Sequence, residues 1–379
     1  MSVKILPVRD RRALWQFIDL PPVLYAGFSG FEPPMRMDRA LLLDPRKSAF
    51  CKRGVVQYWI ALRDGVPVGR ISAQIAEHPA LGMPEGTGLF GCLDVIDDRE
   101  VVAALIDVAE AWLRERGCRH VSGPHLLDMN GEPGLMVGGF DLPPMTATGW
   151  HPPYLQSHLE AMGYAKWKDL HYWGIDLRKT DHAALRQSLR LDRRRLRVTA
   201  RPITRRSLAA ELPLMRDLFN DGWSDNWGHV PLTLDDMQGL LLLRPFLPPQ
   251  AGRVFELDGA PVAIWIAIPN MFELTRGVGP RPSPLGWLKL AWRAIRFRPR
   301  SGLMVLFGIS RRLRFSIASA EVILKLVDEL IEVHLAVGCD WVEAGWALED
   351  NTALTKLLTR YNFEIRRTYR VFGKCLSVR

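Results

Sequence analysis

The feature of this sequence that most constrains its fold is an internal repeat of one order of predicted elements. Each half contains two β-rich runs around a turn, RDGVP or LDGAP, then a third such run, an amphipathic stretch and a further short run. Both amphipathic stretches end in Gly-Cys, within GCRHV and GCDWV. The ranges are 55–75, 88–95, 97–118 and 119–123 in the first half, and 253–268, 302–309, 318–339 and 340–348 in the second. This order predicts α/β (α+β) domains in tandem, with mixed central sheets flanked by helices.

Both halves continue with a short helix that ends near an aromatic residue, at 160–167 and 358–365, before a final strand. Cys118 and Cys339 are 221 positions apart, whereas Tyr164 and Phe363 are 199 apart, so the first half holds 22 extra residues. These residues include the Gly- and Pro-rich stretch GPHLLDMNGEPGLMVGGFDLPP, which predicts a loop. A chain of 379 residues exceeds the usual size of one core, so we expect domains at 1–180 and 181–379.

Composition excludes several classes of protein. The five cysteines are far apart and never form CxxC, which favours reduced thiols over a disulfide framework or a zinc site. The start, MSVKILPVRDRRALW, lacks the apolar core of a signal peptide, and no run reaches the roughly 18 apolar residues of a transmembrane helix. We expect a cytoplasmic protein, with peripheral contact to the cytoplasmic face of the inner membrane as the alternative. No GxSxG motif supports a serine hydrolase, and HExxH, P-loop and GxGxxG motifs are missing as well. No metal is expected.

The formal net charge of +9 is concentrated in two segments. Residues 178–206 hold eleven basic residues against Asp181 and Asp192, and residues 274–320 hold ten basic residues and no acidic one. Such segments indicate an anionic partner, which leaves a phosphorylated cofactor, an anionic lipid and nucleic acid open. Nucleic acid is the least favoured, because no nucleic-acid motif accompanies the charge. The sequence predicts no particular oligomeric state.

The segment LGWLKLAWRAIRFRPR, at 285–300, predicts an amphipathic helix of about three turns that ends before Pro299. One stripe is basic, and the opposing stripe is apolar, with Trp287 beside it. The basic stripe is Lys289, Arg293, Arg296 and Arg300, and the apolar stripe is Leu288, Ala291, Trp292 and Ile295. Short length, cations and tryptophans are typical of a helix that lies on an anionic membrane surface. The alternative is an ordinary core helix.

The order of elements resembles the GNAT (Gcn5-related N-acyltransferase) fold, and the C-terminal half carries the resemblance. Asn351, Leu354, Leu357 and Phe363 follow the spacing that GNAT enzymes show after their fifth strand. More specifically, the chain resembles a bacterial family of tandem GNAT-like proteins to which bacterial ceramide synthases belong. The matching segments are PVGRISA, FGCLD, SGPH, GLMVGGFDLPP, HPPYLQSHLEAMGY, KDLHYW, FNDGWSDNWGHVPLT, GWLKLAW, ALEDNTAL and TYRVFGK.

The resemblance implies that an acyl-CoA thioester is the co-substrate and that a loop opening the long helix of the second half binds its pyrophosphate. The residues that this assigns to cofactor binding are Ser310, Arg311, Arg312, Arg314, Ser316, Ala318 and Asn351. Ser316 and Ala318 stand where the family has glycines, and Leu358 stands where many GNAT enzymes have a tyrosine that protonates the thiolate. The equivalent place in the first half, LDVIDDREVV, is acidic and would repel an anionic cofactor. We therefore expect a structural or substrate-shaping first half and a catalytic second half.

Acyl transfer to an amine needs a donor for the thioester carbonyl and a base for the amine proton. The catalytic candidates are Glu343, Glu349, Asp350 and His229. The substrate-binding candidates are Asn220, Trp223, Asn226, Trp227, His125 and Asn130. Each has a structural alternative: a paired strand carboxylate for Glu343, a helix cap for Asn351, a hydrogen-bonding histidine for His229, and turn chemistry around Asn130.

The favoured hypothesis is an acyl-CoA-dependent N-acyltransferase that forms an amide on a membrane-associated long-chain amine. The resemblance implies a sphingoid base as that amine. The alternatives are an N-acyltransferase for another amine and a non-catalytic protein of tandem GNAT fold that binds acyl-CoA or lipid, which the replacements at Ser316, Ala318 and Leu358 favour.

Overall fold

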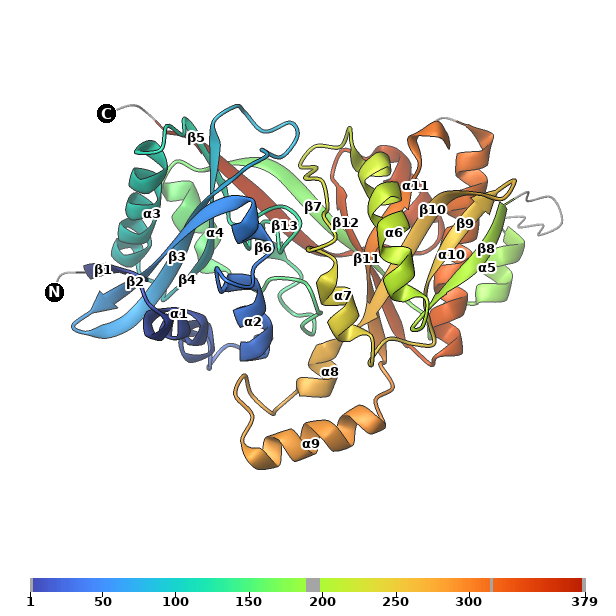
Figure 1. The fold of residues 1–379 in the computed structure, drawn as a ribbon, viewed down its shortest axis with the longest axis horizontal. Coiled ribbons are helices and arrows are strands. Elements are labelled where there is room, and N and C mark those ends of the chain that lie inside the picture. The colour runs from blue at the N-terminus through green and yellow to red at the C-terminus, as the bar shows by residue number, and fades with distance from the viewer. Residues whose placement is uncertain (1–2, 189–197, 314–315, 377–379) are drawn as a thin grey trace. The chain divides into compact units, whose positions relative to one another are not determined.

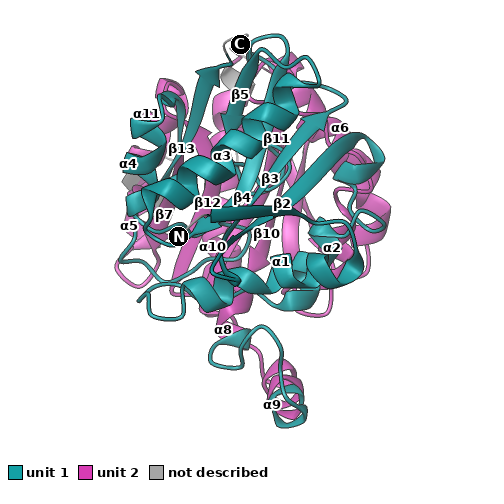
Figure 2. Cartoon of the chain, turned by 90° about the vertical axis from the view of Figure 1, so that its left-hand side faces the viewer, with its two compact units in different colours: residues 1–170, 275–287, 367–379 teal, residues 171–274, 288–366 magenta. Residues whose placement is uncertain are grey.

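The computed structural model describes residues 3–188, 198–313 and 316–376. Two compact units form, and neither is one continuous piece of sequence (Figure 2). Unit 1 comprises residues 1–170, 275–287 and 367–379, and unit 2 comprises residues 171–274 and 288–366. The units thus differ from the expected ranges 1–180 and 181–379 by the segments 171–180, 275–287 and 367–379. Among the described residues, no helix is both long and apolar enough to cross a membrane.

Unit 1 contains a mixed sheet with strand order β1-β2-β3-β4-β5-β13, with β6 also paired to β13 (Figure 1). Its strands are β1 Val3–Pro7, β2 Gly54–Arg63, β3 Val66–Ala76, β4 Thr87–Val95, β5 His120–Gly123, β6 Leu135–Gly138 and the C-terminal part of β13 Glu364–Cys375. Its helices are α1 Arg11–Leu24, α2 Arg36–Leu43, the 3-10 helix η1 Phe50–Lys52, α3 Arg99–Arg114 and α4 Tyr154–Ala161. Strands β4 and β5 are parallel, and β13 runs antiparallel to β5 with Phe372 opposite Gly123.

Unit 2 repeats this arrangement with strand order β8-β9-β10-β11-β12-β7. Its strands are β7 Ala165–Asp176, which begins in unit 1, and β8 Val198–Thr204, β9 Gln250–Leu257, β10 Ala260–Pro269, β11 Ser301–Ile309 and β12 Trp341–Leu348. Its helices are α5 His182–Ser188, α6 Leu208–Trp223, α7 Gln238–Leu243, α8 Met271–Thr275, α9 Pro284–Ile295, the 3-10 helix η2 Arg311–Leu313, α10 Ile317–Ala336 and α11 Thr352–Arg360, of which α8 and α9 extend into the 275–287 segment of unit 1.

The predicted repeat is therefore confirmed as a repeat of structure. Strands β2 to β5 correspond to β9 to β12, and α3 corresponds to α10. The final strands are exchanged, because β13 from the end of the chain pairs with β5 and β7 from the first repeat lies beside β12. The predicted loop at 123–144 contains the short strand β6, which is not predicted because a run of only three apolar residues between glycines does not indicate a strand.

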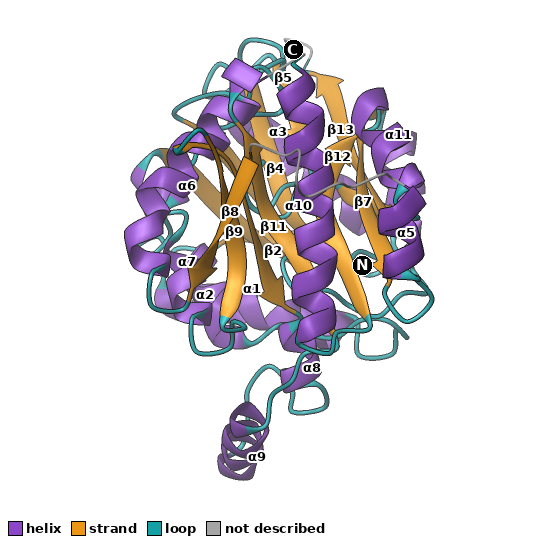
Figure 3. Ribbon diagram, turned by 90° about the vertical axis from the view of Figure 1, so that its right-hand side faces the viewer, coloured by secondary structure: helices purple, strands orange, loops and turns teal. Residues whose placement is uncertain are grey.

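Each unit has its own core between its sheet and its long helix. In unit 1, α3 buries a stripe of apolar residues against the sheet, and in unit 2 α10 does the same (Figure 3). The stripe of α3 is Val101, Val102, Leu105, Ile106, Ala109 and Leu113, and that of α10 is Val322, Leu326, Val327, Leu330, Ile331 and Val333. These spacings of three and four residues place one face of each helix on its sheet. Each long helix begins after the strand that precedes it in its repeat, α3 after β4 and α10 after β11.

Candidate active site

The loop between β11 and α10 lies where the sequence predicts the acyl-CoA pyrophosphate to bind. Ser316 caps the 20-residue helix α10, because its Oγ accepts a hydrogen bond from the backbone N–H of Ser319 at 3.1 Å. The hydroxyl donates to the carbonyl of Leu313 at 2.6 Å. A helix N-terminus attracts anions, and a serine cap leaves this one without a negative charge of its own. The start of α10 thus suits a phosphate-bearing ligand.

The equivalent helix start in unit 1 is closed by a carboxylate. Asp98 caps α3 and accepts hydrogen bonds from the backbone N–H groups of Glu100 and Val101 at 3.0 and 3.2 Å. Its ion pair with Arg63 is the largest cause that holds the pKa of Asp98 below its ordinary value. A fixed anion at this helix start repels a phosphate. The contrast between Ser316 and Asp98 supports the expectation that unit 2 is the cofactor-binding half.

Two arginines of the β11–α10 loop are held by neighbouring groups. Arg311 is exposed and its Nε donates to Asp221 Oδ1 at 3.1 Å, while Arg312 Nη2 donates to the carbonyl of Pro261 at 3.0 Å. Arg314 lies outside the described residues, as does the side chain of Ala318. Arg311 also lies 3.7 Å from Asp225, so two carboxylates offset its charge, whereas Arg312 adds positive charge to this loop.

Asp221 anchors this loop and is not among the residues predicted from the sequence. Its Oδ2 accepts hydrogen bonds from Ser310 Oγ and from the backbone N–H of Arg311, each at 2.8 Å. Burial alone would raise the pKa of Asp221, but the hydrogen bonds from Ser310 and Arg311 lower it below its ordinary value. Its neighbours Asn220 and Trp223 are predicted substrate-binding residues because they lie in a polar, aromatic segment, and this segment also contains Asp221. The carboxylate fixes the point where β11 passes into the loop.

Glu343 is a buried carboxylate on β12, where it lies opposite Leu303 near the start of β11, the strand that leads into this loop. It is 2% exposed and lies on β12, where Trp341 Nε1 donates a hydrogen bond to Glu343 Oε1 at 3.2 Å. Val342 and Ala344 belong to the core around α10, so strand alternation directs Glu343 and Trp341 to the other face of the sheet. A buried carboxylate fixed by an indole suits the role of proton acceptor or of a group that orients an amine.

Trp341 is itself fixed from two sides. The guanidinium of Arg366 lies over its ring, 4.1 Å from the ring centre. Gly174 on β7 leaves room for the indole, because a Cβ at that position would lie 2.5 Å from a ring carbon of Trp341. The hydrogen bond to Glu343 therefore comes from a side chain with little freedom to turn.

The other predicted catalytic carboxylates lie in the turn after β12. Glu349 is half-buried and Asp350 is exposed. Asn351 caps α11, with its Oδ1 accepting from the backbone N–H of Leu354 at 3.2 Å, so the helix-cap alternative is confirmed. Glu349 and Asp350 follow the strand that carries Glu343, but only Glu343 is buried.

The polar, aromatic segment 219–233 begins in the last turn of α6 and is attached to the sheet of unit 2. Trp223 Nε1 donates to the carbonyl of Phe307 on β11 at 2.6 Å, and its ring lies 5.2 Å from that of Trp346 on β12. The Asn220 side chain donates to the carbonyl of Leu232 at 3.0 Å and accepts from its N–H at 2.8 Å. Trp223 therefore contacts the strand that carries Glu343, whereas Asn220 holds the segment in shape.

The remaining candidates of this segment lie in the turn that follows. The backbone N–H of Asn226 donates to the carbonyl of Trp223 at 2.8 Å, and that of His229 donates to the carbonyl of Asn226 at 3.1 Å. Trp227, between them, is half-buried. His229 lies 6.2 Å from the ring of Phe219, and burial lowers its pKa. A neutral His229 at pH 7 is able to accept a proton, so it stays the second candidate base.

The two candidates in unit 1 are parts of a compact turn. His125 is 1% exposed, and its Nε2 lies 3.2 Å from Ser122 Oγ. The backbone N–H of Asn130 donates to Asp128 Oδ1 at 2.9 Å, and Asp128 pairs with Arg53 at 3.2 Å. The bond from Asn130 to Asp128 is turn chemistry, which is the structural alternative given for the residues around Asn130. A ligand role for His125 and Asn130 stays a prediction.

Burial of His125 predicts a loss of stability in acid. Desolvation lowers the pKa of His125 from 6.5 to about 3, so below pH 6.5 the unfolded chain binds a proton that the folded chain does not. Stability therefore falls as pH decreases, by about 2 kcal/mol at pH 5 for this one group. We expect His125→Gln to reduce the difference in unfolding free energy between pH 7 and pH 5 by about that amount. Urea unfolding measures this, with the exposed His78→Gln as control, and equal pH dependence in both variants would contradict the prediction.

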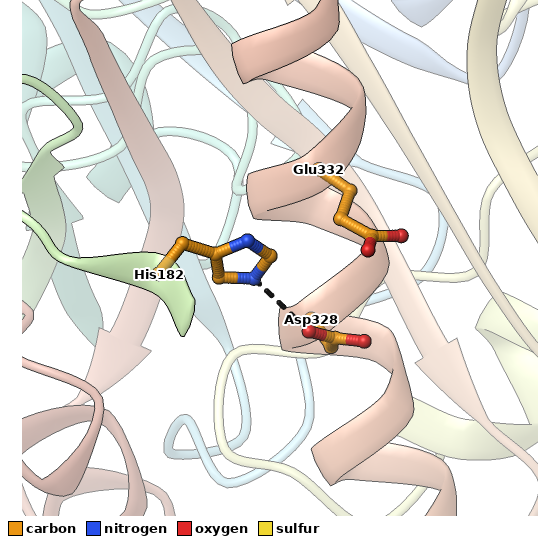
Figure 4. A group of neighbouring side chains, drawn as sticks. All are labelled: His182, Asp328 and Glu332. Carbon is orange, nitrogen blue, oxygen red and sulfur yellow. Dashed lines mark hydrogen bonds and ion pairs between the residues drawn. The ribbon is translucent and has the colours of Figure 1, made fainter. Parts of the chain in front are cut away.

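A histidine–carboxylate cluster ties α5 to α10 on unit 2 (Figure 4). His182 Nε2 lies 3.0 Å from Asp328 Oδ1, and Glu332 follows one helical turn later, with one ligand atom of each residue within 4.8 Å of the others. Such a group could hold a cation, although a partly exposed ion pair is the commoner use of the same residues. Because this cluster joins α5 to α10, we interpret it as structural.

Comparison with known proteins agrees with this description. No protein-family model matches the chain. Protein YghO of Escherichia coli K12 is 33% identical over 366 residues, which cover 96% of this chain and 93% of that protein. The bacterial ceramide synthase of Caulobacter vibrioides is 32% identical over 381 residues, which cover 99% of this chain and 98% of that protein.

Two solved structures share the fold along almost the whole chain. A tandem GNAT protein from the clavulanic acid biosynthesis pathway has a TM-score of 0.58 at 13% identity and covers 100% of both chains. A GCN5-related N-acetyltransferase from Sphaerobacter thermophilus has a TM-score of 0.51 at 12% identity, over 99% of this chain and 96% of that one. With the predicted tandem GNAT fold confirmed and two near-complete sequence matches, the chain belongs to the bacterial family of tandem GNAT-like acyltransferases that includes the Caulobacter protein.

Proposed function

We propose that this protein transfers an acyl group from acyl-CoA to the amino group of a membrane-associated long-chain amine, with a sphingoid base as the preferred acceptor. The observation that carries the proposal is the match to a bacterial ceramide synthase at 32% identity over 99% of the chain. A ceramide synthase joins a fatty acyl group to a sphingoid base through an amide bond. The long-chain acceptor would reach the protein from a membrane.

The two helix starts support unit 2 as the half that binds the acyl-CoA. The uncharged cap Ser316, with Arg312 in the same loop, favours a pyrophosphate, whereas the anionic cap Asp98 of unit 1 opposes one. The small side chain of Ser316 stands in the first glycine position of the family, so close approach of a phosphate to the backbone is retained.

In the proposed reaction the amine nitrogen attacks the thioester carbonyl carbon, the C–S bond breaks, and the amine loses one proton. Glu343 is the residue we assign to that proton, because it is a buried carboxylate held by Trp341. Leu358, in the position of the usual tyrosine, is 6% exposed and belongs to the core, so that position supplies no acid. The coenzyme A thiolate would therefore leave without a tyrosine proton, which its low basicity relative to an alkoxide permits.

The lipids of cells with and without the gene test the proposed acceptor. We expect disruption to remove amide-linked long-chain lipids, and we expect the wild-type gene, but not one encoding Glu343→Gln, to restore them. Mass spectrometry of the extracted lipids measures this. If the lost amides carry a different amine, the protein is still an acyltransferase, but its acceptor is that amine and not a sphingoid base. An unchanged lipid profile would contradict the proposal.

A further inference from the structure

Helix α9 presents an apolar stripe to solvent. Leu285, Leu288, Trp292 and Ile295 follow one another at spacings of three and four residues and are 77%, 67%, 59% and 83% exposed. Leu290, on the other side of the helix, is buried. Figures 1 and 3 show α9 beyond α8 and away from the strands of unit 2. An amphipathic helix normally buries such a stripe, so this one indicates a partner.

Positive charge accompanies the stripe. Lys289, Arg296 and Arg298 are exposed, and no acidic side chain among the described residues pairs with any of them. The guanidinium of Arg296 lies 4.8 Å from the ring centre of Trp292. The predicted basic stripe is wrong in part: Arg293 Nη1 donates to the carbonyl of Leu274 at 3.0 Å, and Arg300 Nε donates to Asp340 Oδ2 at 2.6 Å.

The segments that flank α9 are fixed to their own units. In unit 1, Arg281 Nε donates to Asp19 Oδ1 at 3.0 Å, and the backbone N–H of Gly277 donates to Glu32 Oε1 at 3.2 Å. In unit 2, the bond from Arg300 to Asp340 holds the other end. Anchored ends reduce the entropy that the helix would lose on binding a surface.

We propose that α9 docks on a bilayer that contains anionic phospholipid. The helix lies parallel to the membrane plane, in the interface, with its apolar stripe facing the hydrocarbon region. Twelve helical residues span about 18 Å, which is less than the roughly 30 Å of a hydrocarbon core, so the helix lies in the interface and does not cross it. The four apolar side chains enter the acyl region, and Lys289, Arg296 and Arg298 contact lipid phosphates.

The charges favour this occupant over a second copy of the chain. A two-fold contact through α9 would bring the unpaired cations of both copies together. No acidic residue occurs between residues 274 and 320 to offset them. An anionic bilayer offers phosphates to the cations and a hydrocarbon region to the apolar stripe. The inference rests on the proposed function only in that the lipid amine would be taken from the same bilayer.

Vesicle flotation without acyl-CoA or amine tests the docking separately from the chemistry. The full chain is mixed with vesicles of phosphatidylcholine, alone or with roughly one third phosphatidylglycerol, at about 0.1 M NaCl. We expect the wild type to float with the anionic vesicles. Leu288→Ser combined with Trp292→Ser should lower the partition coefficient at least tenfold, since each substitution removes a large apolar side chain that would enter the acyl region of the bilayer. Val23→Ser combined with Val66→Ser, at exposed positions elsewhere, should leave it unchanged.

The charge arm of the same experiment uses Lys289→Gln, Arg296→Gln and Arg298→Gln together. We expect a loss of about fivefold per cation on anionic vesicles and little change on neutral ones. Arg9→Gln, Arg11→Gln and Arg12→Gln together remove the same charge from exposed positions of unit 1 and should have a smaller effect. Equal flotation of the α9 variants and their controls would overturn the proposal. The proposal would also be overturned if the wild type did not bind vesicles but formed a dimer that the Leu288 and Trp292 substitutions dissociate. Docking without amide formation would instead contradict the proposed function alone.

Discussion

Replacing Glu343 with Gln is expected to lower the turnover number for amide formation by about 10²- to 10⁴-fold, the usual contribution of a general base. The substitution keeps the size of the side chain, and the amide oxygen can still accept the hydrogen bond from Trp341 Nε1. The variant should therefore fold and bind both substrates with similar KM, so that the loss falls on kcat. Steady-state kinetics with an acyl-CoA and sphinganine measure both constants.

Three other variants distinguish this assignment from its rivals. Glu364→Gln changes an exposed carboxylate at the start of β13 and should have full activity. Glu349→Gln and His229→Gln test the other candidate bases. If one of these loses activity as expected for Glu343→Gln while Glu343→Gln retains it, the base has been assigned to the wrong residue.

Replacing Phe372 with Ala is expected to destabilise unit 1 by about 3–5 kcal/mol, the usual cost of removing a buried phenylalanine ring. Phe372 is fully buried on β13, in the core of unit 1 with Val121 and Tyr164. Strand β13 pairs with β5, so the loss should also expose the backbone of His120–Gly123. Hydrogen exchange of β5 amides and denaturant unfolding measure the two effects.

Ile365→Ala provides the matched control, because Ile365 lies on the same strand but is 47% exposed. Its expected cost is below about 1 kcal/mol, with no change in the exchange of β5. If Phe372→Ala left the exchange of β5 amides unchanged, the C-terminal strand would not complete unit 1.

Local patterns were sufficient to predict the repeated elements. The hairpins at 55–75 and 253–268 carry their own turns, and the helices at 97–118 and 318–339 carry an apolar period, so each signal lies within its own segment. The exchange of the final strands has no such signal. Whether β13 pairs with β5 or with a strand nearer in sequence depends on contacts between residues about 250 positions apart, which no short pattern encodes.

The site was predicted less completely, for similar reasons. Strand position alone indicated Glu343, but its burial and its bond to Trp341 became known only from the structure. Asp221 was missed because its partners, Ser310 and Arg311, lie about ninety residues further along the chain. The exposure of the apolar stripe on α9 could not be predicted from the sequence either, since a helix that buries its stripe in a core has the same spacing of apolar residues.

The most direct test of the account is the reaction of purified protein with sphinganine and palmitoyl-CoA labelled with ¹³C in the acyl group. We predict a labelled N-acyl amide that forms in proportion to enzyme, appears with one equivalent of free coenzyme A, and is strongly reduced in Glu343→Gln. Tight binding of palmitoyl-CoA without a labelled amide on sphinganine or any other long-chain amine would contradict the account and identify a binding protein with a GNAT fold.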